Sequence, residues 1–160
     1  MNYINDSEWK ICVKNLPIYA IDLLIYFKEG KLLMGRRINN PAKDYLFVPG
    51  GRILKNETRE KAFERISKNE LGLVLNINHS KFIGIYEHFY DNSKWADQNI
   101  STHYVVEARL MQIENNMVQK FNLSNQHSSF EQIDIKNFEN KNIHPYSLKY
   151  IKELQKINEI

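Results

Sequence analysis

Several features that mark whole classes of protein are scarce in this 160-residue sequence. A single cysteine, Cys12, cannot form a disulfide within the chain, which favours a reducing compartment. No apolar run approaches the roughly 18–20 residues that cross a bilayer, and the first residues lack the basic start and apolar stretch of a signal peptide. We therefore expect a cytoplasmic protein that has no membrane partner.

The chain also has little excess of charge of either sign. The 22 Lys and Arg residues are interleaved with 19 Asp and Glu residues, and the net charge is +3. Nucleic-acid binding usually needs a concentrated basic face, so we expect no nucleic-acid partner. The length and the apolar share of 42% suit a single domain with one core, which we expect to cover residues 1–160.

The spacing of apolar residues predicts an α/β protein. A short amphipathic helix is expected over residues 5–15, ended by Pro17, and a closing helix over 143–157. Strand-like segments, of which the first two form a hairpin, cover 18–27, 32–37, 45–48, 81–89 and 102–110. Residues 113–129 form a long polar segment of the kind that is often functional. Strands interleaved with helices predict a mixed sheet packed between helices. The aromatic residues expected in the core are Phe47, Phe63, Phe82 and Tyr86.

A glycine-rich turn at Gly50-Gly51 leads into a further helix over about 58–71. Asn56 or Thr58 can cap its start, and Gly72 stands where a left-handed C-terminal cap is needed.

One face of that helix carries the candidate metal ligand. Ile66, Asn69 and Glu70 are related by i, i+3 and i+4, so they share a face that keeps one carboxylate. Taken alone, Glu70 is best explained as a solvated helix residue, but the Gly-Gly turn at a matching distance favours a ligand. Mg2+ prefers oxygen ligands, and a carbonyl of the turn can supply a second one. The pattern predicts one metal ion rather than a cluster.

Three further residues have two interpretations each. Glu57 falls near the helix start, where a carboxylate complements the helix dipole, so a structural role is at least as good as a metal role. Arg65 either pairs with Glu57 or contacts a phosphate. A histidine such as His127 has an ordinary pKa near 6.5 and suits a general base, although spacing alone favours a surface histidine. Elsewhere, His144 before Pro145 is expected to cap the closing helix.

The spacing of the central motif resembles the Nudix box, G-x5-E-x7-R-E-U-x-E-E-x-G-U with U apolar. Gly51, Glu57, Arg65, Glu70, Gly72 and Leu73 fit it, whereas Ile66 and Asn69 stand where two glutamates are expected.

These departures, together with motifs outside the box, resemble the GDP-mannose mannosyl hydrolases. The other matching motifs are Gly35-Arg36-Arg37, Asn40-Pro41-Ala42, His88-Phe89-Tyr90-Asp91, Thr102-His103-Tyr104 and Gln126-His127, so the likeness covers nearly the whole chain. The resemblance implies a Nudix fold, an α/β/α sandwich with a mixed β-sheet. It implies a homodimer that hydrolyses GDP-mannose, and GDP-glucose, to GDP and the free sugar. Water would attack the sugar C1 with inversion.

The resemblance also implies roles for individual residues. One Mg2+ per subunit, for which Mn2+ is a possible substitute, would be held by the Gly50 carbonyl, Glu70 and the side-chain carbonyl of Gln126. His127 would be the general base. The catalytic arginines facing the phosphates would be Arg37, Arg52 and Arg65. The residues contacting the nucleotide sugar would be Glu8, Trp9, Asp22, Arg37, His88 and Tyr104, with Glu8 and Trp9 at the nucleobase.

The chemistry of carbon attack agrees with the altered box. A diphosphate bound by Mg2+ and arginines is a stabilised leaving group that needs little protonation, so a base without a partner acid suffices. Attack at phosphorus uses extra metals and carboxylates, which are missing here. Two alternatives stay open: a Nudix pyrophosphatase that attacks phosphorus, and a nucleotide-binding module without turnover, against which Glu70, Gln126 and His127 argue.

Overall fold

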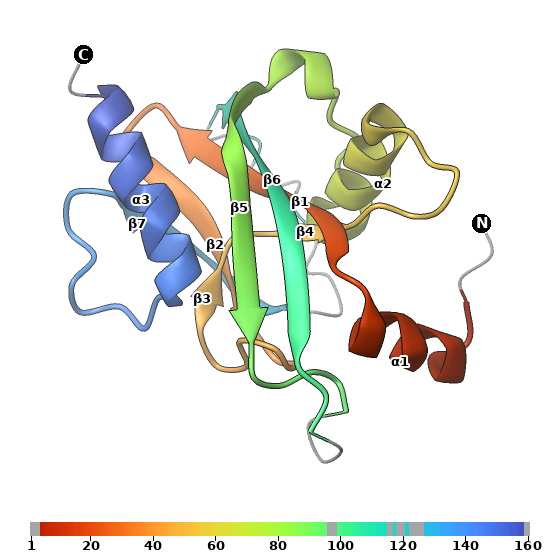
Figure 1. Ribbon diagram of the computed structural model, residues 1–160. Helices are drawn as coiled ribbons and strands as arrows, with labels where there is room; N and C mark the ends of the chain where they lie inside the picture. The colour runs from red at the N-terminus through yellow and green to blue at the C-terminus, as the bar shows by residue number, and fades with distance from the viewer. Residues whose placement is uncertain (1–3, 96–98, 115–116, 118–120, 122–126, 159–160) are drawn as a thin grey trace.

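The computed structural model of the chain describes residues 4–95, 99–114, 117, 121 and 127–158. Within these ranges the helices are α1 (Asp6–Asn15), α2 (Arg59–Leu71), α3 (Pro145–Asn158) and the short 3-10 helix η1 (Ile77–His79). The strands are β1 (Ile18–Phe27), β2 (Lys31–Arg37), β3 (Leu46–Phe47), β4 (Gly50–Arg52), β5 (Lys81–Tyr90), β6 (Thr102–Ile113) and β7 (His127–Asp134). Figure 1 shows their arrangement. No helix in these ranges is long and apolar enough to cross a membrane.

The strands form a mixed sheet centred on β1. Its order is β3-β2-β1-β6-β5, with β4 also paired to β1 and β7 to β2. The β1–β6 pair is parallel, and the other pairs are antiparallel. Along one edge β1 pairs first with β4, over residues 20–22, and then with β2, over residues 26–27. Strands β4 and β2 therefore diverge from each other along this edge, between residues 22 and 26 of β1.

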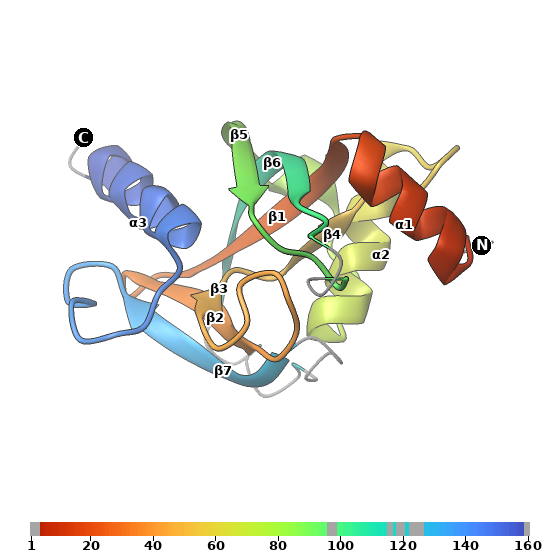
Figure 2. The ribbon, with the colours of Figure 1, turned by 60° about the horizontal axis from the view of Figure 1, so that its bottom comes forward.

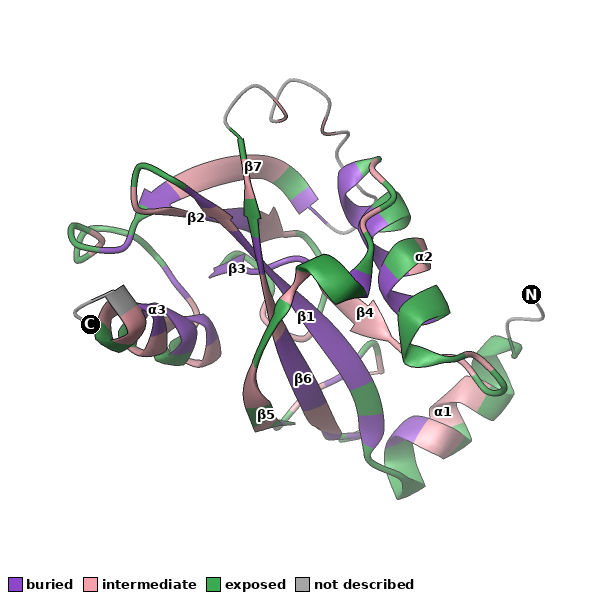
Figure 3. Ribbon diagram, turned by 90° about the horizontal axis from the view of Figure 1, so that it is seen from above, coloured by how far each residue is buried: buried purple, intermediate pink, exposed green. Residues whose placement is uncertain are grey.

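Helices α2 and α3 cover opposite faces of the sheet, so the architecture is the expected α/β/α sandwich (Figures 1 and 2). Alternate side chains of β1 point to opposite faces, as in any strand. Ile21, Leu23 and Ile25 pack on the α2 side, whereas Leu24 packs on the α3 side with Tyr150. The buried residues of both cores are almost all apolar, whereas α1 is largely exposed beside β4 (Figure 3).

Helix α2 begins and ends as its sequence predicts. The Thr58 side chain accepts a hydrogen bond from the Lys61 backbone N–H, so Thr58 rather than Asn56 is the N-cap. Gly72 has φ 77°, the left-handed conformation that glycine adopts without steric cost. The side chain of His144 accepts from the Tyr146 backbone N–H, which confirms its capping role at α3.

Three expectations were wrong. Gly50 and Gly51 open the short strand β4 instead of forming only a turn, because they pair with Asp22 and Ile21 of β1. His127, expected in the polar segment 113–129 and, from spacing alone, at the surface, is buried and starts strand β7, because residues 127–134 pair along β2. Phe82 is 49% exposed, since β5 is an edge strand and the ring lies below the Arg109 guanidinium, 5.3 Å away.

Candidate active site

Two cavities meet at Gly50-Gly51-Arg52 of β4, and all three residues line both of them. The first cavity, of about 240 Å³, lies on the α3 side of the sheet. Its other lining residues are Trp9, Ala20, Asp22, Arg37, Pro41, Ala42, Phe47, Val48, His88, Tyr90, Tyr104 and Val106. The second, of about 160 Å³, lies along α2 and is otherwise lined by Leu54, Arg65, Ile66, Asn69 and Glu70. A ligand with two chemically different parts can therefore span β4.

The register of β1 against β4 and β6 brings the side chains that line the first cavity together. Asp22 lies opposite Gly50, and Ala20 lies opposite both Arg52 and Val106. Residues of the same parity point to one face of a sheet, so these side chains converge. A Cβ at Gly50 would overlap Asp22 Oδ1 and lie 2.8 Å from the Ile21 carbonyl oxygen. Glycine is thus required there for the strands to approach with Asp22 in place.

Asp22 carries a buried carboxyl group, which accepts a hydrogen bond from a residue of α3. The Tyr150 hydroxyl donates to Asp22 Oδ2 over 2.8 Å and lies 3.2 Å from His88 Nε2. Burial raises the pKa of Asp22 to about 7, although the Tyr150 hydrogen bond and the nearby Arg37 charge act in the opposite direction. The cavity floor therefore carries a carboxyl that holds its proton to a much higher pH than an ordinary aspartate does.

Aromatic rings form the cavity wall around His88. The His88 and Tyr146 rings are stacked with centroids 4.1 Å apart, and Tyr90 meets His88 edge-on. Burial lowers the pKa of His88 to about 3 and that of His144 to about 4, with neighbouring positive groups adding to the shift. Both imidazoles are neutral at pH 7, so positive charge at this cavity comes from its arginines.

Arg52 and Arg65 are held on the β4 side. The Arg52 guanidinium carbon lies 3.8 Å from the centroid of the Trp9 ring, a cation–π contact. Arg65 makes a two-point ion pair with Glu57, at 2.7 and 2.8 Å, and also donates to the Arg52 carbonyl oxygen. The pair lowers the pKa of Glu57, principally through the Arg65 hydrogen bonds. Of the two roles open to Arg65, the structure contains the pairing with Glu57.

The second cavity has the donors expected for a single hard cation. Ile66, Asn69 and Glu70 line it together, as their helical spacing predicts. Ile66 is buried and packs on Gly51, where an added Cβ would lie 3.1 Å from Ile66 Cγ1. In the described ranges no group of three or more His, Cys, Asp and Glu side chains could hold a metal. A metal here would be bound by the Glu70 carboxylate with main-chain or amide oxygens, a donor set that fits Mg2+.

His127 is buried against the candidate metal ligand. Its Nε2 lies 3.4 Å from Glu70 Oε2, and strand pairing sets it opposite Arg37. Its Nδ1 has no hydrogen-bond partner among the described residues. The ring also lies over Gly35, where a Cβ would overlap it. The glycine in β2 therefore makes room for this imidazole, which is not the surface histidine that spacing alone favours.

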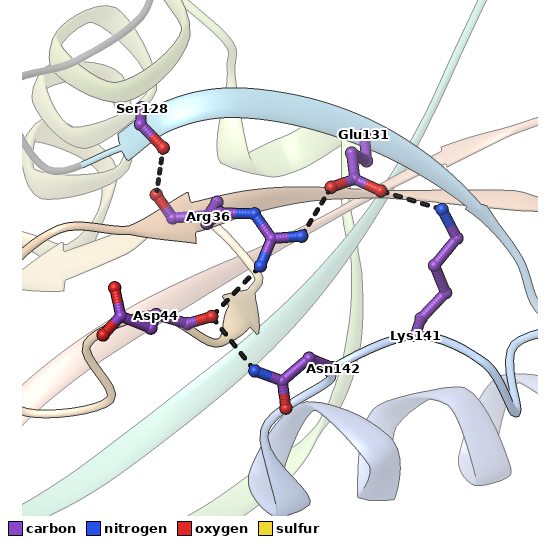
Figure 4. A network of polar contacts seen from close by, with 6 residues as sticks. All are labelled: Arg36, Asp44, Ser128, Glu131, Lys141 and Asn142. Atoms are coloured by element: carbon purple, nitrogen blue, oxygen red, sulfur yellow. Dashed lines mark hydrogen bonds and ion pairs between the residues drawn. The ribbon is translucent and has the colours of Figure 1, made fainter.

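A polar network fixes the loop that carries Pro41 and Ala42 to the cavity rim (Figure 4). Arg36 donates to the Asp44 carbonyl oxygen over 3.1 Å and pairs with Glu131 of β7 over 3.0 Å. Asn142 donates to the same carbonyl, and Lys141 pairs with Glu131. The segment after β7 thus contributes to the shape of the first cavity.

Most of the predicted site residues are brought together. Those lining one or both cavities are Trp9, Asp22, Arg37, Gly50, Arg52, Arg65, Glu70, His88 and Tyr104. Of the other described residues, Glu8 and His127 line neither cavity. The Glu8 carboxylate lies 3.4 Å from the Asn5 backbone nitrogen in a capping box at the start of α1. Gln126 lies outside the described residues, so its ligand role stays a prediction.

Three residues of the site were not predicted from the sequence. Tyr90 is two positions beyond His88 on one strand, and strand alternation alone places both on the same face. Gly35 interrupts a strand pattern, which often marks a close approach. Tyr150 had no such signal, because its spacing in the closing helix is that of a core residue.

Comparison with known proteins agrees with this geometry. Residues 17–154 match the NUDIX domain family. The low-salt glycan biosynthesis protein Agl8 of Haloferax volcanii is 36% identical over 153 residues, 94% of this chain and 90% of that protein. The MutT protein from Methanosarcina mazei Go1 has the same fold, with a TM-score of 0.69, 15% identity and coverage of 90% and 97%. The NUDIX domain of Shewanella oneidensis NrtR, complexed with ADP ribose, gives a TM-score of 0.66 at 14% identity over 96% and 98%.

The chain belongs to the NUDIX domain family, and it is an enzyme of the Nudix hydrolase class, which acts on nucleoside diphosphate derivatives.

The buried carboxyl of Asp22 predicts a pH-dependent stability. Its pKa is about 7 when folded and near 3.8 ordinarily, so the folded chain binds this proton more tightly. The stability it contributes is present below about pH 4 and lost as the pH rises to about 7. We expect the free energy of unfolding of D22N to rise relative to wild type by up to about 4 kcal/mol over that range. Urea unfolding at pH 4.5, 6 and 8 measures this. D91N, at an exposed aspartate, is the control, and a D22N difference that does not change with pH would contradict the assignment.

The contact between Gly35 and His127 predicts a cost for any side chain at position 35. An alanine Cβ overlaps the imidazole, so we expect G35A to destabilise the fold by about 1–3 kcal/mol and to displace His127 from Glu70. Urea unfolding and a crystal structure of the variant measure the two effects. At Gly84 an added Cβ would only approach the Tyr86 ring at 3.3 Å, so G84A is the matched control. An unmoved His127 in G35A would refute this packing constraint.

Proposed function

We propose that the protein hydrolyses GDP-mannose, and GDP-glucose, to GDP and free hexose, with water attacking the sugar C1 with inversion. The proposal includes one Mg2+ per subunit, replaceable by Mn2+. It is carried by one observation: the α2 face of the second cavity offers a single buried carboxylate, Glu70, beside Ile66 and Asn69. A site with one carboxylate favours leaving-group stabilisation over the multi-metal activation of water for attack at phosphorus.

The first cavity supports a sugar substrate. Asp22, His88 and Tyr104 place hydrogen-bonding groups on an aromatic wall, which is the mixture that sugar hydroxyls and ring faces require. Arg37 is close enough to Asp22 to lower its pKa. The same side chain would therefore contact the sugar and, in the proposal, also the neighbouring diphosphate.

The junction between the cavities suits the diphosphate. Arg52 lines both cavities, and Arg65 lines the second beside Glu70. When bound, Mg2+ would neutralise charge on the departing diphosphate, with the Gly50 carbonyl, Glu70 and Gln126 as its proposed ligands. Arg37 and Arg52 would bind the same group through charge-assisted hydrogen bonds, so the leaving GDP needs no proton.

His127 is the proposed base. Its imidazole would take the proton of the attacking water at Nε2, the atom that faces Glu70. This role requires Nε2 to contact water in place of the Glu70 oxygen. The close contact of the ring with Gly35 and the β2–β7 pairing opposite Arg37 would hold the imidazole in position next to Glu70.

Two further observations support the wider proposal. The relative Agl8 is named for glycan biosynthesis, a process that consumes activated sugars, which agrees with a nucleotide-sugar substrate. A homodimer agrees with exposed apolar side chains along the edge strand β5, where Phe82, Ile85 and Phe89 are 49%, 51% and 59% exposed. We place this activity in the cytoplasm.

Hydrolysis in 18O-labelled water tests the bond that breaks. With GDP-mannose and Mg2+ we expect one 18O atom in the released mannose and none in GDP, by mass spectrometry. Label in a phosphate would establish attack at phosphorus and overturn the proposal. Tight binding of GDP-mannose without release of GDP would instead establish a binding module.

The base assignment predicts a selective loss of turnover in H127Q. Glutamine keeps polar atoms at the site but cannot accept the proton, so we expect kcat to fall by about 10²–10⁴ with little change in the Kd for GDP. Steady-state kinetics and calorimetry measure the two quantities. H103Q, which alters a half-exposed histidine stacked on Phe89, is the control. An H127Q variant with full kcat would remove His127 from the mechanism.

A further inference from the structure

We propose that Trp9 is a positioning residue for Arg52: its indole face holds the guanidinium at the junction of the two cavities, where a diphosphate binds. The family resemblance gives Trp9 a contact with the nucleobase, and the structure adds a contact with Arg52. The inference rests on the proposed function, because it takes the diphosphate as the ligand of Arg52.

The backbone and the side chain of Arg52 are held by different parts of the chain. Its backbone is fixed by pairing with Ala20 and by the hydrogen bond from Arg65 to its carbonyl oxygen. Its side chain lies with the guanidinium carbon 3.8 Å from the Trp9 centroid. An arginine side chain has several rotatable bonds and loses considerable entropy when it is ordered. A contact made before the ligand arrives reduces the entropy lost on binding.

Trp9 is itself anchored, so it can serve as a fixed surface. Helix α1 begins with a capping box in which Asn5 and Glu8 satisfy each other's backbone N–H groups. On its inner side, Val13 of α1 is buried with Ile18 and Ile100, and Trp9 packs against this cluster. The capping box also gives Glu8 a structural function: it stabilises the helix that presents Trp9.

The contact between Trp9 and Arg52 predicts which ligands should lose affinity when Trp9 is substituted. The guanidinium already occupies one face of the indole ring, so a change at Trp9 alters the position of a phosphate-binding charge. A ligand that has neither base nor sugar should therefore bind less tightly when Trp9 is lost. A residue that only contacts the nucleobase would have no such effect.

The second tryptophan gives a matched control. Trp95 packs against the same Val13, Ile18 and Ile100 cluster but does not line the first cavity. Its cationic neighbour is Lys94, 5.7 Å from the ring centroid, and not an arginine of the site. Substituting either tryptophan by leucine disturbs the same small core, and only W9L removes the surface below Arg52.

Calorimetric titration with inorganic pyrophosphate in the presence of Mg2+ tests the inference. We expect W9L to weaken pyrophosphate binding by about three- to tenfold, W9F by about two- to threefold, and W95L to leave it unchanged. Pyrophosphate that binds W9L and W9F as tightly as wild type would overturn the inference, as would a loss in GDP affinity alone. A wild-type protein that does not bind pyrophosphate would also overturn it.

A double-mutant cycle separates positioning from general damage. In the R52L background, W9L should cause no further loss of pyrophosphate affinity, because the group it positions is gone. Additive losses would mean that Trp9 acts independently of Arg52 and would refute the proposal. Thermal unfolding checks that each variant folds; if W9L does not, W9F and the W9F/R52L pair carry the same comparison. The outcome is independent of which bond of GDP-mannose breaks, so failure of the proposed reaction and failure of this inference are distinguishable.

Discussion

The site depends on one close approach, between β1 and β4 at the pair Asp22 and Gly50. A side chain at Gly50 would overlap the Asp22 carboxylate, so the approach exists only with glycine. This short pairing occupies the edge of β1 that β2 leaves free, and it carries Arg52 next to Ala20. The two cavities share β4 as a common wall because the strand lies between the sheet face and α2. If the pairing were lost, the junction of the two cavities would be lost with it.

The same approach has an electrostatic consequence. Asp22 is closed off by β4 on one side and by Tyr150 of α3 on another, and burial raises its pKa to about 7. The neutral state of His88 follows from the same exclusion of water. Positive charge is concentrated instead in arginines, which stay ionised even when buried. Hydrogen-bonding groups gather in the first cavity and Arg52 lies at its junction with the second, which supports the proposed substrate with a neutral sugar and an anionic diphosphate.

The sequence predicts well the features that depend on neighbouring residues. The caps of α2, and the shared face of Ile66, Asn69 and Glu70, follow from spacing within a single helix. It does not predict features that depend on contacts between distant segments. The strand character of Gly50 to Arg52 comes from its partner β1, and β7 has few buried residues because it pairs only along β2. Tyr150 is 128 residues from Asp22, and no local pattern indicates their hydrogen bond. Phe82 was expected in the core because its apolar character does not reveal that β5 is an edge strand.

On the face of α2 that departs from the full Nudix box, Ile66 is part of the hydrophobic core. Ile66 is buried with Phe63 and Leu71 and rests on Gly51, so the position that would carry a glutamate in a full box is filled by apolar contacts. A glutamate there would bury a charge in an apolar cluster, at a cost of several kcal/mol unless it were paired. Asn69, by contrast, is exposed at the cavity edge. A carboxylate could therefore be introduced at position 69 without repacking, whereas position 66 is filled by the packing of β4 on α2.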